Sequence, residues 1–239
     1  MKILLMGYGK MGKVIERFAI ERGHTITAKI DLDNQSDFDQ LSKTDVDIAI
    51  EFSHPNSAFN NIKKCIEKGF PIVVGTTGWL AQKPEIEQLT IEKNGTFLYA
   101  SNYSVGVNLF FELNKKLAQL MSPYSFYEVN TREVHHTEKK DAPSGTAITL
   151  AEGLMTNLTG KTNWVNNEIA KPNEIPIWSE REAKVPGTHI VRYISDVDEI
   201  EISHKAVSRE GFALGAIVAA EWAVNQKGVL SLADLYQAI

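Results

Sequence analysis

The sequence predicts an α/β protein: a parallel β-sheet with helices on both faces, and an α+β domain inserted into it. Three observations support this class. Short β-branched runs alternate with longer amphipathic stretches through the first hundred residues. A glycine-rich turn directly follows the first of these runs. After Asn102 the pattern changes to one long stretch of apolar residues at helical spacing, followed by runs in which apolar and polar residues alternate.

The first half of the chain is predicted to consist of strands and helices in turn. Its strand segments are almost continuously apolar, as expected for parallel strands that are covered on both faces. Its helix segments carry apolar residues at helical spacing. We expect strands at 2–6, 24–31, 45–53, 70–77 and 95–102, and helices at 11–22, 55–68 and 84–93.

The second half mixes long helices with strands that have one exposed face. Its last helix is apolar on most sides and must be well buried. We expect helices at 105–121, 147–158 and 211–225, strands at 126–136, 188–195 and 198–206, the last two antiparallel, and a loop-rich stretch at 160–188 that contains Pro172, Pro176 and Pro186.

The bulk properties exclude several classes of protein. A chain of 239 residues can form one large or two small domains. A formal net charge of −5 and the absence of a basic run argue against a nucleic-acid partner. The single cysteine, Cys65, excludes an intrachain disulfide framework and favours a reducing compartment. The first apolar run is too short for a signal peptide or a membrane span, so we expect a cytoplasmic protein without a membrane partner.

The segment "GYGKMG" (7–12) follows the first strand and opens the first helix. Gly7, Gly9 and Gly12 have the G-x-G-x-x-G spacing, which lets a pyrophosphate approach the backbone at a helix N-terminus. Asp31 ends the second strand about twenty residues further on, where an acidic group meets the adenosine ribose hydroxyls. A glycine turn without a ligand is the alternative, but this context favours a Rossmann-type dinucleotide site.

The identity of the dinucleotide stays open between NADH and NADPH. Leu32 follows Asp31, where an arginine would hold a 2′-phosphate, and this favours NADH. Lys10 and Lys29 offer compensating positive charge for NADPH.

Two further segments follow the fourth and fifth strands. These are "GTTGW" (75–79) and "ASNYSVGVN" (100–108), and ligands collect at the carboxyl ends of parallel strands. Their small residues and hydroxyls would let a nicotinamide lie against the backbone. Ordinary turns between strands and helices are the alternative.

The stretch "VHHTEKKDAPSGTA" (134–147) concentrates groups that donate or accept protons. His135 and His136 end a predicted strand, so their side chains should point to opposite faces, and one of them can act in a cleft. Lys139 lies in the turn beyond the strand. A satisfied strand histidine and a solvated lysine are the alternatives, and each alone is more common than a functional role.

Ser144, Gly145 and Thr146 are expected in the first turn of the next helix. Free amide hydrogens at a helix start suit an anion such as a carboxylate. A simple helix cap at Ser144 is the alternative. Together with the preceding histidines and lysine, these residues predict a cationic pocket for an acidic substrate that gains a hydride and a proton.

Five segments in order resemble the 4-hydroxy-tetrahydrodipicolinate reductases, the dihydrodipicolinate reductase family of bacterial lysine and diaminopimelate synthesis. They are "GYGKMG", "GTTGW", "ASNYSVGVN", "EVHHTEKKDAPSGTA" and "EISHKAVSREGFALGA". The resemblance spans nearly the whole chain, and the histidine–lysine–"DAPSGTA" block is highly specific. The chain departs from many members by lacking one more glycine in the first loop and by its brief segment before "VPGTH".

The resemblance implies that NADH or NADPH reduces 4-hydroxy-tetrahydrodipicolinate, a cyclic dicarboxylate, to tetrahydrodipicolinate with loss of water. His135 resembles the catalytic proton donor and acceptor, and Lys139 the proton donor. His136 resembles a substrate contact, and Gly145 with Thr146 the pair that holds a substrate carboxylate. No metal is expected. The cofactor positions fall on Gly7, Tyr8, Gly9, Lys10, Met11, Gly12, Asp31, Gly75, Thr76, Thr77, Ala100, Ser101, Asn102 and Tyr103.

The change of pattern along the chain predicts two domains, with the last segment returning to the first. Residues 1–103 and 212–239 are expected to form the dinucleotide-binding domain. Residues 104–211 are expected to form a domain for substrate binding and oligomerisation, since the family is usually homotetrameric through the sheets of its second domain.

Two other classes of protein compete with this prediction. One is a regulatory protein that senses NAD(P) without catalysis. The other is a different Rossmann-type reductase, for example one that acts on aspartate or an aspartyl derivative. Such enzymes often use a cysteine nucleophile, and Cys65, inside a predicted helix, is a poor candidate.

Overall fold

The computed structural model describes residues 1–208 and 210–237. The chain forms two compact units. The first consists of Met1–Val105 and Glu210–Ile239, and the second of Gly106–Arg209. The chain therefore leaves the first unit once and returns to it.

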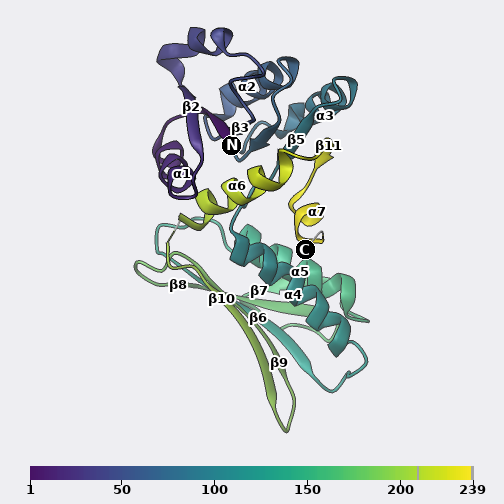
Figure 1. The fold of residues 1–239 in the computed structure, drawn as a ribbon. Helices are drawn as coiled ribbons and strands as arrows, with labels where there is room; N and C mark the ends of the chain where they lie inside the picture. Colours follow the sequence, from purple (N-terminus) through teal and green to yellow (C-terminus); the bar gives the residue numbers. More distant parts are fainter. Residues whose placement is uncertain (209, 238–239) are drawn as a thin grey trace. The chain divides into compact units, whose positions relative to one another are not determined.

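The first unit is built on a six-stranded parallel sheet in the order β11-β5-β4-β3-β1-β2 (Figure 1). The predicted α/β class is confirmed. The strands are β1 Lys2–Met6, β2 Thr25–Ile30, β3 Ile48–Glu51, β4 Ile72–Val74, β5 Thr96–Tyr99 and β11 Gly228–Leu230. The helices are α1 Lys10–Glu21, α2 Pro55–Glu67, α3 Lys83–Glu92, α6 Glu210–Ala223 and α7 Leu232–Gln237, with 3₁₀ helices at Leu32–Gln40 and Leu80–Gln82.

Two apolar cores explain why this sheet has helices on both faces. One core joins the sheet to α1 and α6, through residues such as Ile15 and Ile217. The other joins it to α2 and α3, through residues such as Ile62 and Ile86. All residues of β3 and β4 are buried, and all but Glu51 at the end of β3 are apolar, as predicted for strands covered on both sides.

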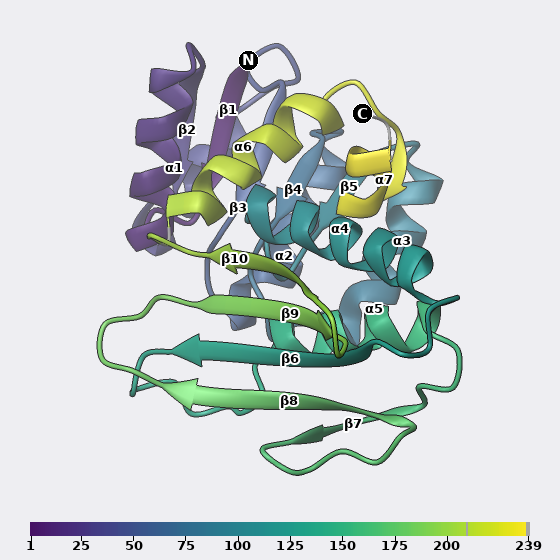
Figure 2. The ribbon, with the colours of Figure 1, turned by 90° about the horizontal axis from the view of Figure 1, so that it is seen from below.

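The second unit is a five-stranded mixed sheet in the order β10-β9-β6-β8-β7. Its strands are β6 Glu128–His135, β7 Asn163–Asn166, β8 Glu174–Arg181, β9 Thr188–Ile194 and β10 Glu199–Lys205. β6 pairs antiparallel with β9 and parallel with β8. Figure 2 shows β9, β6 and β8 side by side. The predicted antiparallel pairing of the last two strands is confirmed by β9 and β10.

Two helices cover one face of this second sheet. They are α4 (Val105–Met121) and α5 (Gly145–Asn157). Phe110 and Leu150 pack with Ile177 and Tyr193 of the strands in one apolar core. The opposite face keeps partly exposed residues such as Trp178. Among residues 1–208 and 210–237, no helix combines the length and apolar character that a membrane span requires.

The prediction of a loop-rich stretch at 160–188 is wrong, because this stretch contains β7 and β8. Its prolines argued against strands, because proline has no N–H to donate to a sheet. Pro176 nevertheless lies inside β8, and its carbonyl oxygen accepts a hydrogen bond from the Thr131 hydroxyl (3.1 Å). β11 and α7 were also not predicted, because segments this short carry too little periodicity.

Two glycines of α6 provide a matched test of the packing in the first unit. A Cβ added at Gly215 would lie 1.6 Å from the carbonyl oxygen of Tyr103, whereas one at Gly211 would meet nothing closer than 3.7 Å. We expect Gly215→Ala to lower the free energy of unfolding by about 3 kcal/mol or more through overpacking. Gly211→Ala should be neutral or stabilising by up to about 1 kcal/mol. Urea unfolding measures both, and equal losses would contradict this packing.

Candidate active site

The glycine-rich loop between β1 and α1 has the shape of a phosphate-binding turn. Gly7 has a φ of +93°, and a Cβ there would lie 2.3 Å from the carbonyl oxygen of Phe52. A Cβ at Gly12 would lie 2.4 Å from the Gly7 carbonyl oxygen. Gly9 caps α1 without a side-chain hydrogen bond, and a Cβ there would meet nothing within 4 Å. The loop therefore presents open backbone at a helix N-terminus, which suits a pyrophosphate.

A cavity of about 200 Å³ adjoins this loop. Asp31 lines it, and its carboxylate accepts hydrogen bonds from the backbone N–H groups of Tyr8 (3.0 Å) and Leu32 (2.8 Å). The structure therefore places Asp31 next to the glycine loop. The cavity is lined by Gly7, Tyr8, Gly9, Ile30, Asp31, Leu32, Gln35, Phe52, Ser53, His54, Ser57 and Asn61.

The two lysines considered for binding a 2′-phosphate, Lys29 and Lys10, lie in different surroundings. The ammonium of Lys29 lies 2.6 Å from Glu16 Oε1 and 4.6 Å from the centre of the Tyr8 ring. Glu16 also accepts a hydrogen bond from the Tyr8 hydroxyl. The ammonium of Lys29 is thus already paired with a carboxylate. Lys10 is exposed at the start of α1, and Met11 next to it is half-buried.

The segments after β4 and β5 also belong to the first unit. Gly75 is needed beside Phe52, because a Cβ there would lie 2.1 Å from the phenyl ring. Thr76 is buried and its hydroxyl accepts a hydrogen bond from the Ser53 N–H (2.8 Å), whereas Thr77 is exposed. Small side chains therefore border this end of the sheet.

Tyr103 differs from its neighbours after β5. Its side chain is buried, and its hydroxyl donates to the carbonyl oxygen of Val74 (2.8 Å). Ala100 and Asn102 are half-buried and Ser101 is exposed. The Tyr103 side chain is therefore part of the core, which leaves its backbone as the part that can meet a ligand.

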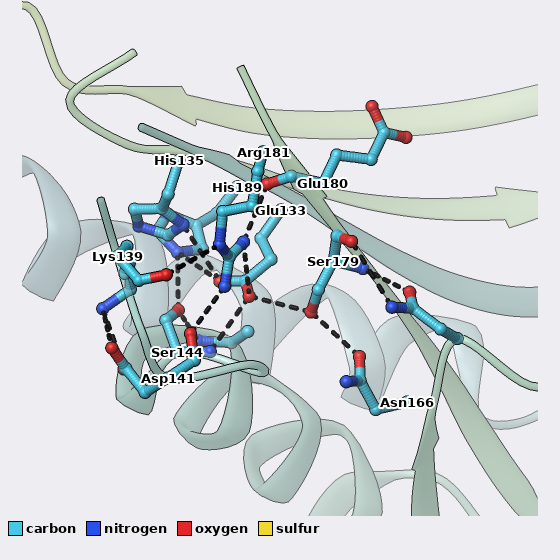
Figure 3. A network of polar contacts seen from close by, with 12 residues as sticks. Glu133, His135, Lys139, Asp141, Ser144, Asn166, Ser179, Glu180, Arg181 and His189 are labelled. Atoms are coloured by element: carbon cyan, nitrogen blue, oxygen red, sulfur yellow. Dashed lines mark hydrogen bonds and ion pairs between the residues drawn. The ribbon is translucent and has the colours of Figure 1, made fainter. Parts of the chain in front are cut away.

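A row of polar side chains crosses the second sheet on the face that α5 covers. In the strand register, Glu133 of β6 lies opposite Ser179 of β8 and His189 of β9. His135 follows two residues after Glu133 and lies opposite Arg181. Figure 3 shows these side chains pointing toward one another. The register alone thus gathers groups from three strands.

Glu133 is the centre of this row, and it is fully buried. Its Oε1 accepts hydrogen bonds from the Ser179 hydroxyl (2.8 Å) and the Ser144 backbone N–H (3.0 Å). Its Oε2 lies 3.2 Å from His135 Nδ1 and 3.7 Å from His189 Nε2. The guanidinium of Arg181 lies 3.7 Å from Oε1. Five groups therefore converge on one carboxylate.

These contacts determine the charge state of Glu133. Burial opposes ionisation, but His135, His189, Ser144 and Ser179 outweigh it, and the pKa of Glu133 lies well below its usual range. Burial lowers the pKa of His189, against the effect of the Glu133 carboxylate, and the neighbouring His135 adds to the lowering. Glu133 is therefore an anion at neutral pH, and His189 is a neutral imidazole.

The start of α5 is attached to the same cluster. Ser144 is the N-cap of the helix, its hydroxyl accepting a hydrogen bond from the Ala147 N–H (3.2 Å) and lying 3.3 Å from His189 Nε2. The first N–H bonded within the helix backbone is that of Ile148. A Cβ at Gly145 would meet nothing within 4 Å. The N–H groups of Gly145 and Thr146 thus stand at an open helix start, which suits an anion.

The loop that carries Lys139 is held to the sheet by Arg181. The guanidinium of Arg181 donates to the carbonyl oxygens of Lys139 (3.3 Å) and Asp141 (2.5 Å). The Lys139 ammonium lies 2.8 Å from both carboxylate oxygens of Asp141 and lowers the pKa of that carboxyl. The Lys139 N–H donates to the carbonyl oxygen of His136, which is half-buried at the strand end. His135 and Lys139 are therefore both anchored around Glu133.

Glu133, His135 and His189 also meet the geometric requirement for a metal site, because each offers one ligand atom and these atoms lie within 4.8 Å of one another. The carboxylate–imidazole contacts account for the same arrangement without an ion.

Four residues of this cluster are not among those that the sequence predicts for the site. Glu133 was within reach, because it precedes His135 by two positions in an alternating strand and must share its face. Ser179 and Arg181 fell in the stretch predicted to be loop-rich. His189 was placed in a strand, but nothing local shows that this strand pairs with β6.

A glycine loop that opens the first helix on a parallel sheet, together with an inserted unit bearing clustered proton-handling groups, defines a Rossmann-type oxidoreductase with a nicotinamide cofactor. Comparison with known proteins specifies the family. The model of the dihydrodipicolinate reductase N-terminus matches residues 1–103, and that of the C-terminus matches residues 106–236. The chain belongs to the dihydrodipicolinate reductase family.

Individual relatives agree with this assignment. The chain is 46% identical to the 4-hydroxy-tetrahydrodipicolinate reductase of Christiangramia forsetii, over 98% of this chain and 97% of that protein. It is 35% identical to the Methanosarcina acetivorans enzyme of the same name, over 95% and 86%. The fold matches a dipicolinate-bound dihydrodipicolinate reductase from Paenisporosarcina sp. TG-14, with a TM-score of 0.74, 20% identity and 97% of each chain covered.

Proposed function

We propose that this protein reduces 4-hydroxy-tetrahydrodipicolinate to tetrahydrodipicolinate with loss of water, using NADH or NADPH, in lysine and diaminopimelate biosynthesis. The observation that carries the proposal is the 46% identity to a reductase of this name over 98% of the chain. The clustering of His135, Lys139 and the open start of α5 in one unit supports it. A cytoplasmic location fits the single, buried and unpaired Cys65.

The chain's own residues would bind the substrate and supply protons. One substrate carboxylate would accept hydrogen bonds from the N–H groups of Gly145 and Thr146 at the start of α5. Ser144 would hold the start of the helix in place, since its hydroxyl already accepts a hydrogen bond from the Ala147 N–H. The bound nicotinamide supplies the hydride when the cofactor is present.

Protons would be handled by His135 and Lys139, with His136 contacting the substrate beside them. The Lys139 ammonium is paired with Asp141, whose side chain is 60% exposed. An ion pair exposed in this way is weak. A dianionic substrate would therefore be able to take the place of Asp141 and bring the ammonium to the reacting ring.

The cofactor would be bound by the first unit, and the residues present fit a dinucleotide. The turn at Gly7, Gly9 and Gly12 leaves open backbone for the pyrophosphate, and Asp31 faces the adjoining cavity, where the adenosine ribose hydroxyls would lie. We expect NADH to be preferred, because the Asp31 carboxylate would repel a 2′-phosphate and the Lys29 ammonium is already paired with Glu16. The segments Gly75–Thr77 and Ala100–Tyr103 would border the nicotinamide.

The domain roles and assembly follow the same proposal. Residues 1–103 and 212–239 would bind the dinucleotide, and 104–211 would bind the substrate and form a homotetramer. The sheet face opposite α4 and α5 supports assembly, because it exposes Trp178 beside cross-strand ion pairs such as Arg132–Glu180. Such a face can pair apolar and charged groups with another copy of itself.

The catalytic roles can be tested by coupling the purified protein to a synthase that makes the unstable substrate and following nicotinamide absorbance. Removing a positioned acid or base typically costs 10²–10⁴-fold. We expect His135→Gln and Lys139→Ala to lower kcat by about 10²-fold or more. Lys140→Ala, which changes an exposed neighbour, should keep the wild-type rate. No oxidation with either cofactor, or an unchanged rate in both variants, would contradict the proposal.

The cofactor preference can be tested with Asp31 and Lys29. Wild-type protein should have a higher kcat/KM with NADH than with NADPH. Asp31→Asn removes the negative charge that repels a 2′-phosphate, and we expect it to shift the ratio toward NADPH by about tenfold. Lys29→Met should leave the ratio unchanged if Glu16 already holds the lysine. A loss of NADPH activity in Lys29→Met would instead show that Lys29 binds the phosphate.

A further inference from the structure

The Glu133 carboxylate neither binds the substrate nor exchanges a proton in the proposed reaction. Glu133 is fully buried and ionised. A buried charge is retained only where surrounding donors compensate for the loss of water. Around Glu133, β8 and the start of α5 supply hydrogen-bond donors, and β6 and β9 supply imidazoles in electrostatic contact. Packing alone would be served by an apolar residue, so the charge itself calls for an explanation.

The two oxygens of this carboxylate have different partners. Oε1 accepts from the Ser179 hydroxyl and the Ser144 N–H. Oε2 faces only imidazoles among the described residues, with Nδ1 of His135 at 3.2 Å and Nε2 of His189 at 3.7 Å. Nδ1 of His135 and Oε2 of Glu133 are both buried and neither makes a well-aligned hydrogen bond, so at 3.2 Å they meet as a close electrostatic contact without competition from solvent. The nearest charge to this nitrogen is thus the Glu133 carboxylate.

An anion beside one imidazole nitrogen determines where the proton of the neutral ring resides. A proton on Nδ1 faces Oε2, whereas a lone pair there would face the negative charge and be repelled. The ring then carries its lone pair on Nε2. A Cβ added at Gly187 would lie 3.1 Å from Nε2, so the glycine leaves this edge of the ring without a side chain over it.

We propose that Glu133 is a positioning residue of the reductase, whose carboxylate holds His135 in the Nδ1–H tautomer and leaves Nε2 to exchange protons with the substrate. This inference rests on the proposed role of His135. It gives the buried charge a function, because a carboxylate offers only acceptors to Nδ1 whereas an amide of the same size offers an acceptor or a donor and does not fix the tautomer. It also distinguishes the two oxygens, since Oε1 supports the fold while Oε2 orients the imidazole.

The first test reads the tautomer directly in the wild-type protein. Protein labelled with ¹⁵N-histidine gives separate Nδ1 and Nε2 resonances, and those of His135 are the ones lost in His135→Gln. At a pH where the ring is neutral, we expect Nδ1 to be protonated and Nε2 to be unprotonated. A neutral ring that carries its proton mainly on Nε2 would overturn the proposal, whether or not any Glu133 variant folds.

The second test separates positioning from structural support. Glu133→Gln keeps the size of the side chain and removes its charge, and we expect kcat to fall by about 10²-fold, with a smaller change in KM. Ser179→Ala removes a hydrogen bond to Oε1 and leaves Oε2 facing His135, so kcat should fall far less than in Glu133→Gln. EDTA in every assay removes any metal ion that the cluster would bind.

The outcomes of these assays distinguish a failure of the positioning role from a failure of the proposed function. If Glu133→Gln keeps the wild-type kcat while His135→Gln loses it, the positioning role is wrong and the proposed function stands. If His135→Gln itself keeps the wild-type kcat, the proposed catalytic role of His135 is wrong, and the positioning role that rests on it is wrong as well. Equal losses of kcat in Glu133→Gln and Ser179→Ala would indicate a purely structural carboxylate and would overturn the inference.

Discussion

The ionised carboxylate of Glu133, buried inside the second unit, is the constraint on which the site depends. An anion without water is stable only when donors surround it, and a buried network left partly satisfied is worse than an apolar core. Here the Ser179 hydroxyl of β8 and the backbone N–H of Ser144, the N-cap of α5, donate to one carboxylate oxygen, and the imidazoles of His135 and His189 lie beside the other. The strands and the helix must therefore be correctly placed together before the charge can be tolerated.

This requirement links the sheet register to the proposed chemistry. A one-residue slip in a strand would turn its side chains to the opposite face and separate Glu133 from His189 and Ser179. Arg181 extends the arrangement, because it approaches Glu133 and also binds the backbone of the loop that carries Lys139. The imidazole, the ammonium and the helix start are thus held by one connected set of contacts, which favours the fixed geometry that proton transfer needs.

The sequence predicted the parts of the protein that local patterns determine. The helix at 105–121 was predicted because its apolar residues recur at helical spacing. The glycine turn was predicted because its backbone geometry requires glycines at fixed positions. The cluster around Glu133 was only half visible. His135 and Lys139 stood out by their chemistry, and the period of two would have placed Glu133 beside His135. His189 and Arg181 join them only because β6 pairs with β9 and β8. Which strands pair depends on residues far apart in the sequence, and no single segment shows it.

The most direct test of this account is a pH titration of the Glu133 side-chain carboxyl, followed by ¹³C resonances of protein labelled at the glutamate carboxyl carbon. The Glu133 signal is the one that disappears in Glu133→Gln. The account predicts that it keeps the ionised chemical shift through the range near pH 4.3 in which an ordinary glutamate takes up its proton. A Glu133 carboxyl that is protonated at or above that range would contradict a buried anion at the centre of the site.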